Sequence, residues 1–295
     1  MLSILITSFK EPRSIGKAIE SFLNQDIKEK FELIVSAPDK ETQDVVETYV
    51  KKNKKVKLFK DPGKGKSYAL NLLLKKAKGE VIILSDGDVY VSENSVAEIF
   101  KEFQDSKIGC VSGRPMPLES RKTKYGYWAN FLFASAHRMR KKLREQGKFL
   151  ECSGYLWAFR NNVIASFPLD VAEDTIVPYI FWEKGYKIGY AESALVYVKN
   201  VSNWKEWLSQ KVRTSRSHET LNKYVDTKKI PRTKTFSNEA KGIFSVFSYP
   251  KNLRELFWSL QLIFSRLYVW IVVFFQVYFK KNYHRDSWER VESTK

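Results

Sequence analysis

The sequence has few of the residues that tie together small secreted folds or structural metal sites. Only two cysteines occur in 295 residues, Cys110 and Cys152, and their spacing fits neither a zinc site nor a disulfide framework. The pair is typical of a reducing compartment or of simple core packing. The chain also lacks internal repeats and low-complexity segments, which excludes a repeat architecture.

Acidic residues are scarce relative to basic ones. Lys and Arg number 51 against 33 Asp and Glu, which gives a net charge of +18. Such an excess implies an anionic partner, which could be nucleic acid, a lipid surface or a phosphorylated substrate. The amino terminus lacks a basic leader and a long apolar run, so we expect a first strand at 2–7 and no signal peptide.

Apolar runs alternate with segments of helical periodicity in the first half of the chain. Strands are predicted at 2–7, 31–36, 56–59 and 81–84, and helices at 14–24, 41–52, 66–76 and 95–103. This rhythm predicts an α/β fold with a mostly parallel, Rossmann-like sheet flanked by helices. The segment SGRPMP at 112–117 then breaks the pattern.

The fourth predicted strand ends in two aspartates separated by one glycine. Residues two apart on an extended backbone point the same way, so Asp86 and Asp88 can face one site, and Gly87 lets another group approach the main chain. Open α/β sheets bind ligands at the carboxyl ends of their strands. Hard oxygen ligands there suit a divalent cation that also binds phosphate. Taken alone, the tripeptide is more often a charged turn.

Two further segments bear on membrane association. Residues 121–148 hold nine Lys or Arg, one acid and several aromatic residues, including Tyr127, Trp128 and Phe131. This segment is either an amphipathic helix on an anionic membrane surface or a solvated helix that packs its aromatics on the core. The apolar run at 256–279 has a length that suits a bilayer span. Arg266 within it argues against a simple lipid-facing helix. From its length we still expect a spanning or deeply interfacial helix, with a core helix of a soluble protein as the alternative.

The order of motifs resembles that of family 2 inverting glycosyltransferases of the GT-A fold. The segments that carry the resemblance are LSILITSFKEP, FELIVSAPD, GKGKSYALNLLLKKAKGEVIILSDGD, AED and QKVR, which together span residues 1–216. The resemblance implies a domain at 1–230 that binds a nucleotide-diphosphate sugar with Mg²⁺ or Mn²⁺. Its half at 1–110 would bind the donor and its half at 111–230 the acceptor. A linker at 231–250, a membrane-associated or transmembrane helix at 251–282 and a basic tail at 283–295 would follow.

The resemblance also implies roles for single residues. Asp88 is similar to the metal-coordinating acid of the family's DXD motif, and Asp86 to its first acid, near the ribose, the sugar or a metal-bound water. Asp174 matches the catalytic base, which would deprotonate the acceptor on the face opposite the diphosphate. The other implied nucleotide-sugar residues are Thr7, Glu11, Asp39, Lys66, Gln210 and Arg213. The implied acceptor-side residues are Ser153, Gly154, Trp157 and Glu173, with Tyr155 or Trp157 stacking on a sugar ring.

Structural explanations compete at several of these positions. Where the family has Asp-Asp-Gly-Ser this chain reads APDK, so Asp39 is displaced by about one position and also suits a turn. Asp174 also suits a helix amino terminus, and Lys66 a solvated surface position. Processive members carry Trp where this chain has Thr214, which weakens any prediction of polymer synthesis. His218 is expected at the surface.

Three functions remain open from the sequence. The first is a metal-dependent inverting glycosyltransferase, membrane-associated with a cytoplasmic catalytic domain. Its donor would be UDP-linked in preference to GDP-linked, and its acceptor a lipid-linked glycan, a polyprenyl phosphate or a polysaccharide, with no nucleic-acid partner. The second is a nucleotidyltransferase, whose usual Gly-rich, Arg-containing loop is absent from SFKEP. The third is a non-enzymatic basic module for lipid or nucleic acid, which leaves Asp86, Asp88 and Asp174 without a role.

Overall fold

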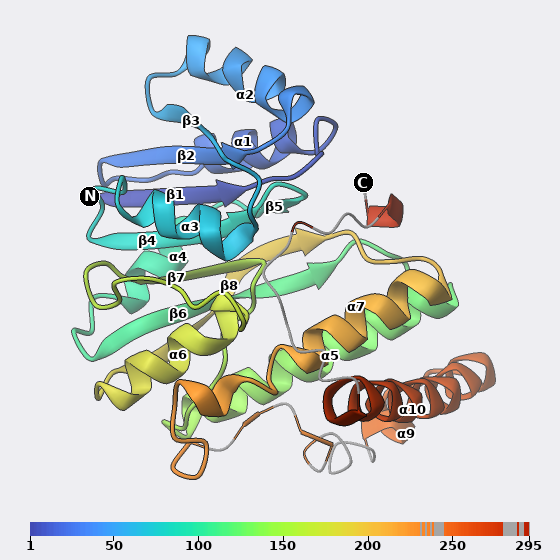
Figure 1. Ribbon diagram of the computed structural model, residues 1–295. Coiled ribbons are helices and arrows are strands. Elements are labelled where there is room, and N and C mark those ends of the chain that lie inside the picture. The colour runs from blue at the N-terminus through green and yellow to red at the C-terminus, as the bar shows by residue number, and fades with distance from the viewer. Residues whose placement is uncertain are drawn as a thin grey trace.

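One curved sheet of eight strands organises the computed structural model, in the order β3-β2-β1-β4-β7-β6-β8-β5 (Figure 1). The structure describes residues 1–230 and 245–279, together with positions 232, 233, 235, 236, 238, 288 and 292–294. The strands are β1 Leu2–Thr7, β2 Phe31–Ala37, β3 Val56–Lys60, β4 Val81–Asp86, β5 Val89–Val91, β6 Ile108–Pro117, β7 Leu156–Arg160 and β8 Lys187–Val198.

The longer helices alternate with these strands along the chain. They are α1 Ile15–Leu23, α2 Lys40–Lys52, α3 Lys66–Leu74, α4 Ser95–Glu102, α5 Lys124–Glu145, α6 Glu173–Glu183, α7 Trp204–Arg216 and α10 Leu253–Phe274. Shorter turns of helix lie at Leu221–Lys223, Ser245–Ser248 (α9) and Glu292–Thr294, and α10 continues as a π-helical turn at Phe275–Phe279. The helices and strands expected up to residue 103 are confirmed within two residues at most ends.

The sheet is parallel in its first half and mixed in its second. Strands β3, β2, β1 and β4 pair in parallel, as do β6 and β8, whereas β7 runs antiparallel to β4 and β6, and β5 to β8. Parallel pairings are thus four of seven. β6 continues through the predicted break at 112–117, because its register with β8 shifts between Ser112 and Arg114 and so accommodates the following proline.

Alternating side chains of the strands enter two separate hydrophobic layers. Ile4 and Ile6 of β1 join the layer formed with α1, α2 and α4, while Leu5 joins the layer formed with α3 and α6. Helices therefore cover both faces of the sheet, as the sequence predicts.

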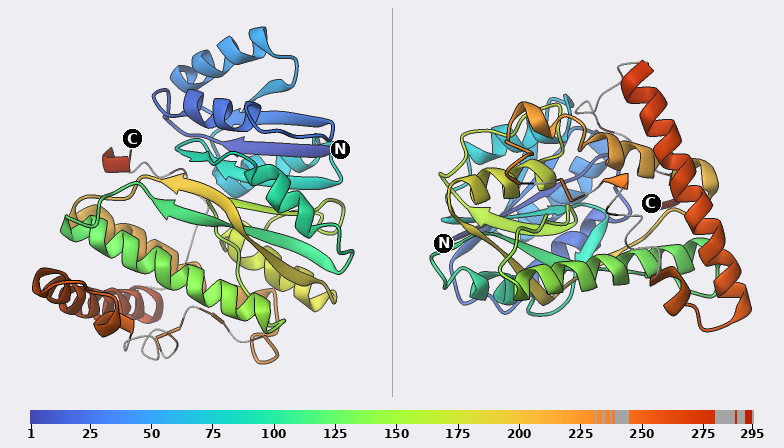
Figure 2. Two further views of the ribbon diagram at one scale, coloured as in Figure 1. Left: turned by 180° about the vertical axis from the view of Figure 1, so that it is seen from behind. Right: turned by 90° about the horizontal axis from the view of Figure 1, so that it is seen from below.

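A third hydrophobic cluster joins α10 to α5 and α7, and Figure 2 shows α10 crossing both at the edge of the molecule. Trp128 Nε1 donates to the Trp258 carbonyl oxygen at 2.8 Å, and the hydroxyls of Tyr127 and Ser259 lie 2.6 Å apart. The aromatic residues of α5 are buried in this cluster, as the packed interpretation of 121–148 predicts, and the membrane-lying one stays a prediction.

The carboxyl-terminal part is described in pieces. Leu253–Phe279 is the one helix among the described residues that is long and apolar enough to cross a membrane, by length and composition. The predicted linker at 231–250 contains α9, and most of its other residues lie outside the described set. The same holds for positions 280–282 and for most of the predicted basic tail at 283–295.

Candidate functional site

The Asp-Gly-Asp segment forms the turn that joins β4 to β5. The register of the sheet places Thr7 beside Asp86, and Thr7 Oγ1 donates a hydrogen bond to Asp86 Oδ1 at 3.4 Å. A Cβ on Gly87 would collide with Ser8 Oγ and lie 2.5 Å from Glu11 Oε2. Glycine is therefore required here because the first loop packs directly on the main chain, as the sequence predicts. Ser8 Oγ donates to Glu11 Oε2 at 2.7 Å, which fixes that loop.

Lys66, the first residue of α3, links the acidic turn to α6. Its Nζ lies 2.7 Å from Asp86 Oδ1 and 2.8 Å from Glu173 Oε1. Burial alone would lower the pKa of Lys66, but the two carboxylates raise it well above its ordinary value. Burial, and then the negative charge of Asp88, raise the pKa of Asp86 more than Lys66 lowers it. Lys66 is thus not a solvated lysine, and the buried Glu173 belongs to this acidic cluster, while its predicted acceptor role stays a prediction.

The start of β7 and the start of α6 meet the end of β4. Because β7 is antiparallel to β4, its first residues lie beside the last residues of β4, and Ser85 Oγ donates to the Tyr155 carbonyl oxygen at 2.9 Å. A Cβ on Gly154 would lie 2.8 Å from Asp174 Oδ2. The Asp174 carboxylate therefore packs directly on the main chain of Gly154.

The Tyr155 hydroxyl lies where the charged groups converge. Its pKa is raised first by burial and then by the negative charges of Asp88 and Asp86, is lowered by Arg213 of α7, and is raised again by Asp174. Four charged side chains from the β4–β5 turn, α6 and α7 thus act on one phenol. The structure therefore brings together Asp86, Asp88, Asp174 and Arg213, which lie far apart in the sequence.

Two expectations near β7 and α7 are wrong. Trp157 is fully buried between the sheet and the α3–α6 layer, with its ring centroid 5.3 Å from that of Phe159, so it cannot stack on an acceptor sugar. His218 is also fully buried, and its Nε2 lies 3.1 Å from Glu151 Oε2. Ser153 is buried too, and its backbone N–H donates to Ser112 Oγ at 3.0 Å. Of the aromatic pair at 155 and 157, only Tyr155 reaches the site.

Asp39 has a structural role at the start of α2. Its Oδ1 accepts from the Thr42 backbone N–H at 2.9 Å, and its Oδ2 accepts from the Lys10 backbone N–H at 2.7 Å. Burial acts to raise the pKa of Asp39, but these backbone hydrogen bonds outweigh it and the pKa is lowered. Asp61 follows β3, the strand next to β2 in the sheet. It is buried, and its carboxylate accepts a hydrogen bond from Ser36 Oγ at 3.2 Å. Acids thus follow β2, β3 and β4 at one edge of the sheet.

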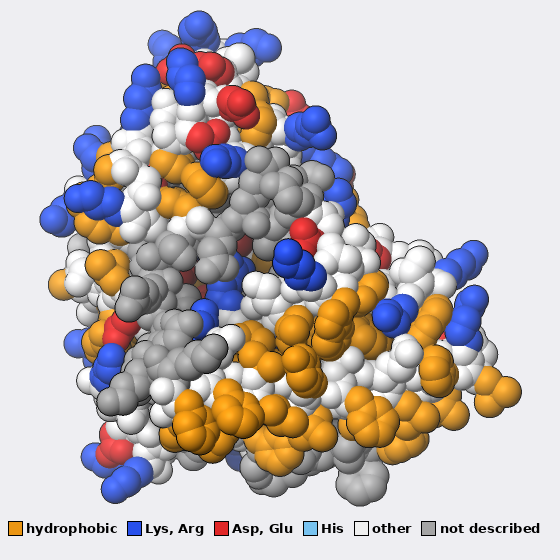
Figure 3. Space-filling view, turned by 45° about the vertical axis from the view of Figure 1, so that its right-hand side comes forward, with side chains coloured by type: hydrophobic (Ala, Val, Ile, Leu, Met, Phe, Trp, Pro, Cys, Tyr) orange, Lys and Arg blue, Asp and Glu red, His pale blue; other side chains and the backbone are white. Residues whose placement is uncertain are grey.

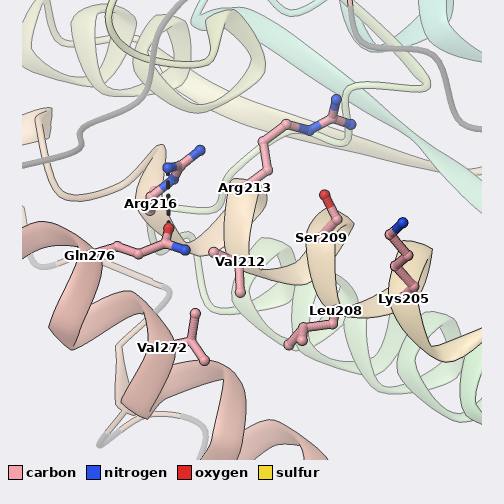
Figure 4. Close-up of a pocket in the computed structure, with 8 residues that line it drawn as sticks. All are labelled: Lys205, Leu208, Ser209, Val212, Arg213, Arg216, Val272 and Gln276. Atoms are coloured by element: carbon pink, nitrogen blue, oxygen red, sulfur yellow. Dashed lines mark hydrogen bonds between the residues drawn. The ribbon is translucent and has the colours of Figure 1, made fainter. Parts of the chain in front are cut away.

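The α7 helix contributes the basic side of the site. Gln210 and Arg213 lie three residues apart on α7, so they share one side of the helix. Figure 4 shows the Arg213 side chain extending away from α10. Its guanidinium is suited to bind phosphate oxygens in pairs.

The acidic turn fits a divalent cation that shares its shell with a ligand. Across the part of the chain that the structure describes, no group of three or more His, Cys, Asp or Glu is arranged to hold a metal alone. Asp86 and Asp88 nevertheless offer hard oxygens from one turn, and the charge of Asp88 raises the pKa of Asp86. A cation relieves such repulsion, and Mg²⁺ or Mn²⁺ commonly takes a few carboxylates together with phosphate oxygens.

Comparisons with known proteins bear on the family and the fold of the chain. The sequence model of the family described as "Glycosyl transferase family 2" matches residues 3–167, more than half of the chain. The protein "Probable glycosyltransferase YdaM" of Bacillus subtilis is 26% identical over 232 residues, which are 74% of this chain and 55% of the relative. The chain therefore spans about half the length of that relative.

Two solved structures share the fold. The mannosyltransferase PcManGT from Pyrobaculum calidifontis, in complex with GDP-Man and Mn²⁺, has a TM-score of 0.66 at 15% identity over 95% of this chain and 87% of that one. S. aureus TarS 1–349, in complex with UDP-GlcNAc, has a TM-score of 0.51 at 15% identity over 96% and 93%. The predicted GT-A-type fold is confirmed, and the chain belongs to glycosyl transferase family 2.

Proposed function

We propose that the protein is a metal-dependent, inverting glycosyltransferase that moves a sugar from a nucleoside diphosphate to an acceptor held at a membrane. The observation that carries this proposal is the cluster at the end of β4, where Lys66 joins Asp86 to Glu173, Asp174 packs on Gly154, and the charges of Asp88, Asp174 and Arg213 act on the partly buried Tyr155. That set contains the groups which the reaction needs: carboxylates for a metal, a cation for phosphate and a carboxylate for the acceptor proton.

The donor would lie along the edge where the acids follow β2, β3 and β4. Asp88 and Asp86 would hold Mg²⁺ or Mn²⁺, which when bound neutralises charge on the departing diphosphate. Arg213 adds a positive charge from α7, on the side of the site away from Asp86 and Asp88, where it would bind the same departing diphosphate. One solved relative in fold binds GDP-Man and the other UDP-GlcNAc, so the proposed preference for UDP is a matter for the assay below.

Asp174 is the proposed base. It lies in the first turn of α6, where the helix dipole favours its ionised form, and Gly154 fixes its position. From there it accepts the acceptor's proton as the new glycosidic bond forms. The nearby Cys152 is an unsuitable nucleophile because burial raises the pKa of its thiol. A single displacement, which inverts the anomeric carbon, needs no covalent intermediate.

The proposed membrane association rests on α10. Figure 3 shows apolar side chains gathered in a broad band along the lower edge of the molecule. Exposed members on α10 and its π-helical continuation include Phe257, Phe264, Tyr268, Ile271, Phe275 and Phe279. The other side of α10 packs against α5 and α7. At the start of α10, Arg121 Nη2 lies 2.7 Å from Glu255 Oε2 and adds an ion pair to this packing. A helix attached along its length cannot cross a bilayer alone, so we propose that it lies in the cytoplasmic face of the membrane.

The proposal is tested with the purified full chain and a panel of UDP-, GDP- and dTDP-sugars, each with Mn²⁺ or Mg²⁺. One donor class should bind and, with membrane extract as acceptor, release nucleoside diphosphate. Asp174→Asn should keep donor binding and lose transfer, whereas Asp88→Asn should lose metal-dependent donor binding. If no donor binds, the proposal is wrong. Release of pyrophosphate instead of nucleoside diphosphate would favour a nucleotidyltransferase.

A further inference from the structure

Glu151 is a buried carboxylate that the proposed reaction does not use. It lies in the segment before β7 and is only 5% exposed. The Tyr179 hydroxyl of α6 donates a hydrogen bond to Glu151 Oε1 at 3.1 Å, and Nε2 of the fully buried His218 lies 3.1 Å from Glu151 Oε2. Burial of a carboxylate is costly unless its oxygens are hydrogen-bonded, and here each oxygen has a partner on a different element.

These two contacts join the three elements that carry the candidate site. The Glu151 carboxylate lies three residues before Gly154, on whose main chain Asp174 packs. Tyr179 belongs to α6, and the first turn of the same helix holds Asp174. The histidine follows directly after α7, the helix that presents Arg213. One buried side chain thus connects the supports of the proposed base and of the phosphate-binding cation.

The imidazole ring of His218 is held at both of its nitrogens. Nδ1 lies 3.1 Å from the carbonyl oxygen of Thr214, one turn back on α7. A carbonyl oxygen only accepts, so Nδ1 carries a hydrogen. One further proton then bonds Nε2 to the Glu151 carboxyl group, whichever of the two carries it. Because Thr214 adjoins Arg213, the ring fixes the turn of α7 from which Arg213 extends.

Two arginines hold the main chain on both sides of the pair. Arg140 Nε of α5 donates to the Glu151 carbonyl oxygen at 3.0 Å. Arg232 Nη1 donates to the His218 carbonyl oxygen at 3.2 Å and lies 3.0 Å from Glu219 Oε2. The backbone of each partner is therefore anchored as well as its side chain.

The thiol of Cys152 is close to both Glu151 and the proposed base. Burial raises the pKa of this thiol, Arg140 lowers it, and the negative charges of Asp174 and then Glu151 raise it again. Two carboxylates that act on one side chain lie within a short distance of each other. The pair is therefore located directly behind Asp174.

We propose that the Glu151–His218 pair positions the proposed base and the phosphate-binding cation for sugar transfer. The inference rests on the proposed function and adds positioning residues to it. Both partners are buried, so they act through the groups that they hold, Asp174 and Arg213, and do not touch a substrate. Misplacement of a catalytic group by about 1 Å can cost about 100-fold in rate, so the pair matters for transfer without contacting the reacting atoms.

The test compares two substitutions of Glu151 in the full chain. Glu151→Leu removes both hydrogen bonds at similar volume. It should lower kcat at least about tenfold and change the donor Kd by less than about threefold, because the proposed metal ligands lie on the β4–β5 turn. Glu151→Gln should restore kcat to within about twofold, because its amide N–H donates to Nε2 of a neutral ring and its amide oxygen accepts from Tyr179.

Glu32→Leu is the matched control for loss of a buried carboxylate. Glu32 is 3% exposed, and it accepts from Ser3 Oγ at 2.7 Å and from Lys57 Nζ at 2.6 Å. It lies near the start of β2, at the opposite end of the strands from the site. Glu32→Leu should lower Tm as Glu151→Leu does and leave kcat unchanged.

Tyr179→Phe tests the same connection with the loss of a single oxygen, and it decides the matter if Glu151→Leu does not fold. It should lower kcat about threefold and leave the donor Kd unchanged. The readouts are steady-state release of nucleoside diphosphate with membrane extract as acceptor, donor titration, and circular dichroism to check that each variant is folded.

Three results would overturn the positioning role. They are an unchanged kcat in folded Glu151→Leu, or in Tyr179→Phe where Glu151→Leu does not fold; a Glu151→Gln protein as slow as Glu151→Leu; and a Glu32→Leu protein as slow as Glu151→Leu. Each of these leaves the proposed function intact, provided that the unchanged protein binds donor and transfers sugar. Absence of donor binding by the unchanged protein overturns the proposed function instead.

Discussion

Replacing Gly154 by alanine should slow sugar transfer while leaving the protein folded. The new Cβ would lie 2.8 Å from Asp174 Oδ2, and ordinary van der Waals contact begins at 3.4 Å, so the carboxylate must move by about 0.6 Å (3.4 − 2.8). Misplacement of a catalytic group by about 1 Å can cost about 100-fold in rate. We therefore expect kcat to fall roughly 10- to 100-fold. Donor affinity should stay unchanged, because the proposed metal and phosphate ligands lie on other elements.

The assay is steady-state release of nucleoside diphosphate, with donor Kd by titration and Tm by calorimetry. Gly147→Ala is the control: its φ of +60° makes alanine strained by about 1 kcal/mol, but nothing lies within 4 Å of the new Cβ. It should lower Tm and leave kcat unchanged. The double variant Gly154→Ala/Asp174→Asn should be no slower than Asp174→Asn alone, because both changes act through one carboxylate. A folded Gly154→Ala protein with kcat within about twofold of the unchanged enzyme would refute this reasoning.

Three further predictions follow from the described contacts. Lys66→Met leaves Asp86 beside a second carboxylate with no cation between them, so urea titration should show the free energy of unfolding lowered by about 3 kcal/mol; an unchanged midpoint would contradict the bridging role. Asp88→Asn should weaken donor binding at least about tenfold in Mn²⁺. EDTA should weaken donor binding by the unchanged protein to the same extent, and should not weaken donor binding by the variant any further. If EDTA weakens donor binding by the variant as much as by the unchanged protein, Asp88 is excluded as a metal ligand. The pKa of Glu255 is held below its ordinary 4.5, first by the hydrogen bond from Arg121. The contribution of ionised Glu255 to the free energy of unfolding is complete above pH 4.5 and is lost as the pH falls through the lowered pKa. Tm should therefore fall between these two pH values, and Glu255→Gln should remove this part of the pH dependence.

The elements of the first half follow directly from local pattern. Apolar runs such as that of β4 and the helical spacing in α2 are properties of adjacent residues, so their bounds are predicted within about two residues. The strands β6 and β8 are different. Their pairing depends on contacts between distant segments and on a register shift beside a proline, which no local window contains.

The candidate site divides in the same way. Asp86, Asp88 and Asp174 are recognised by motif, and the structure brings them together. The sequence does not indicate the burial of Trp157 and His218, because burial depends on which helix covers a strand or a turn, and neighbouring residues do not reveal that helix. For Lys66 the motif indicates the position but not the two carboxylates that it bridges. Tyr155 is singled out in the sequence beside Trp157, but only the antiparallel pairing of β7 with β4 places it beside the acidic turn.

The turn between β4 and β5 has a consequence for the curvature of the sheet. β4 lies in the middle of the sheet and β5 at its far edge, yet only Gly87 and Asp88 separate them along the chain. Two extended residues reach about 7 Å, so β5 must begin close to the end of β4. Because β5 pairs with β8, the sheet has to curl until its last strands return to the acidic turn at the end of β4.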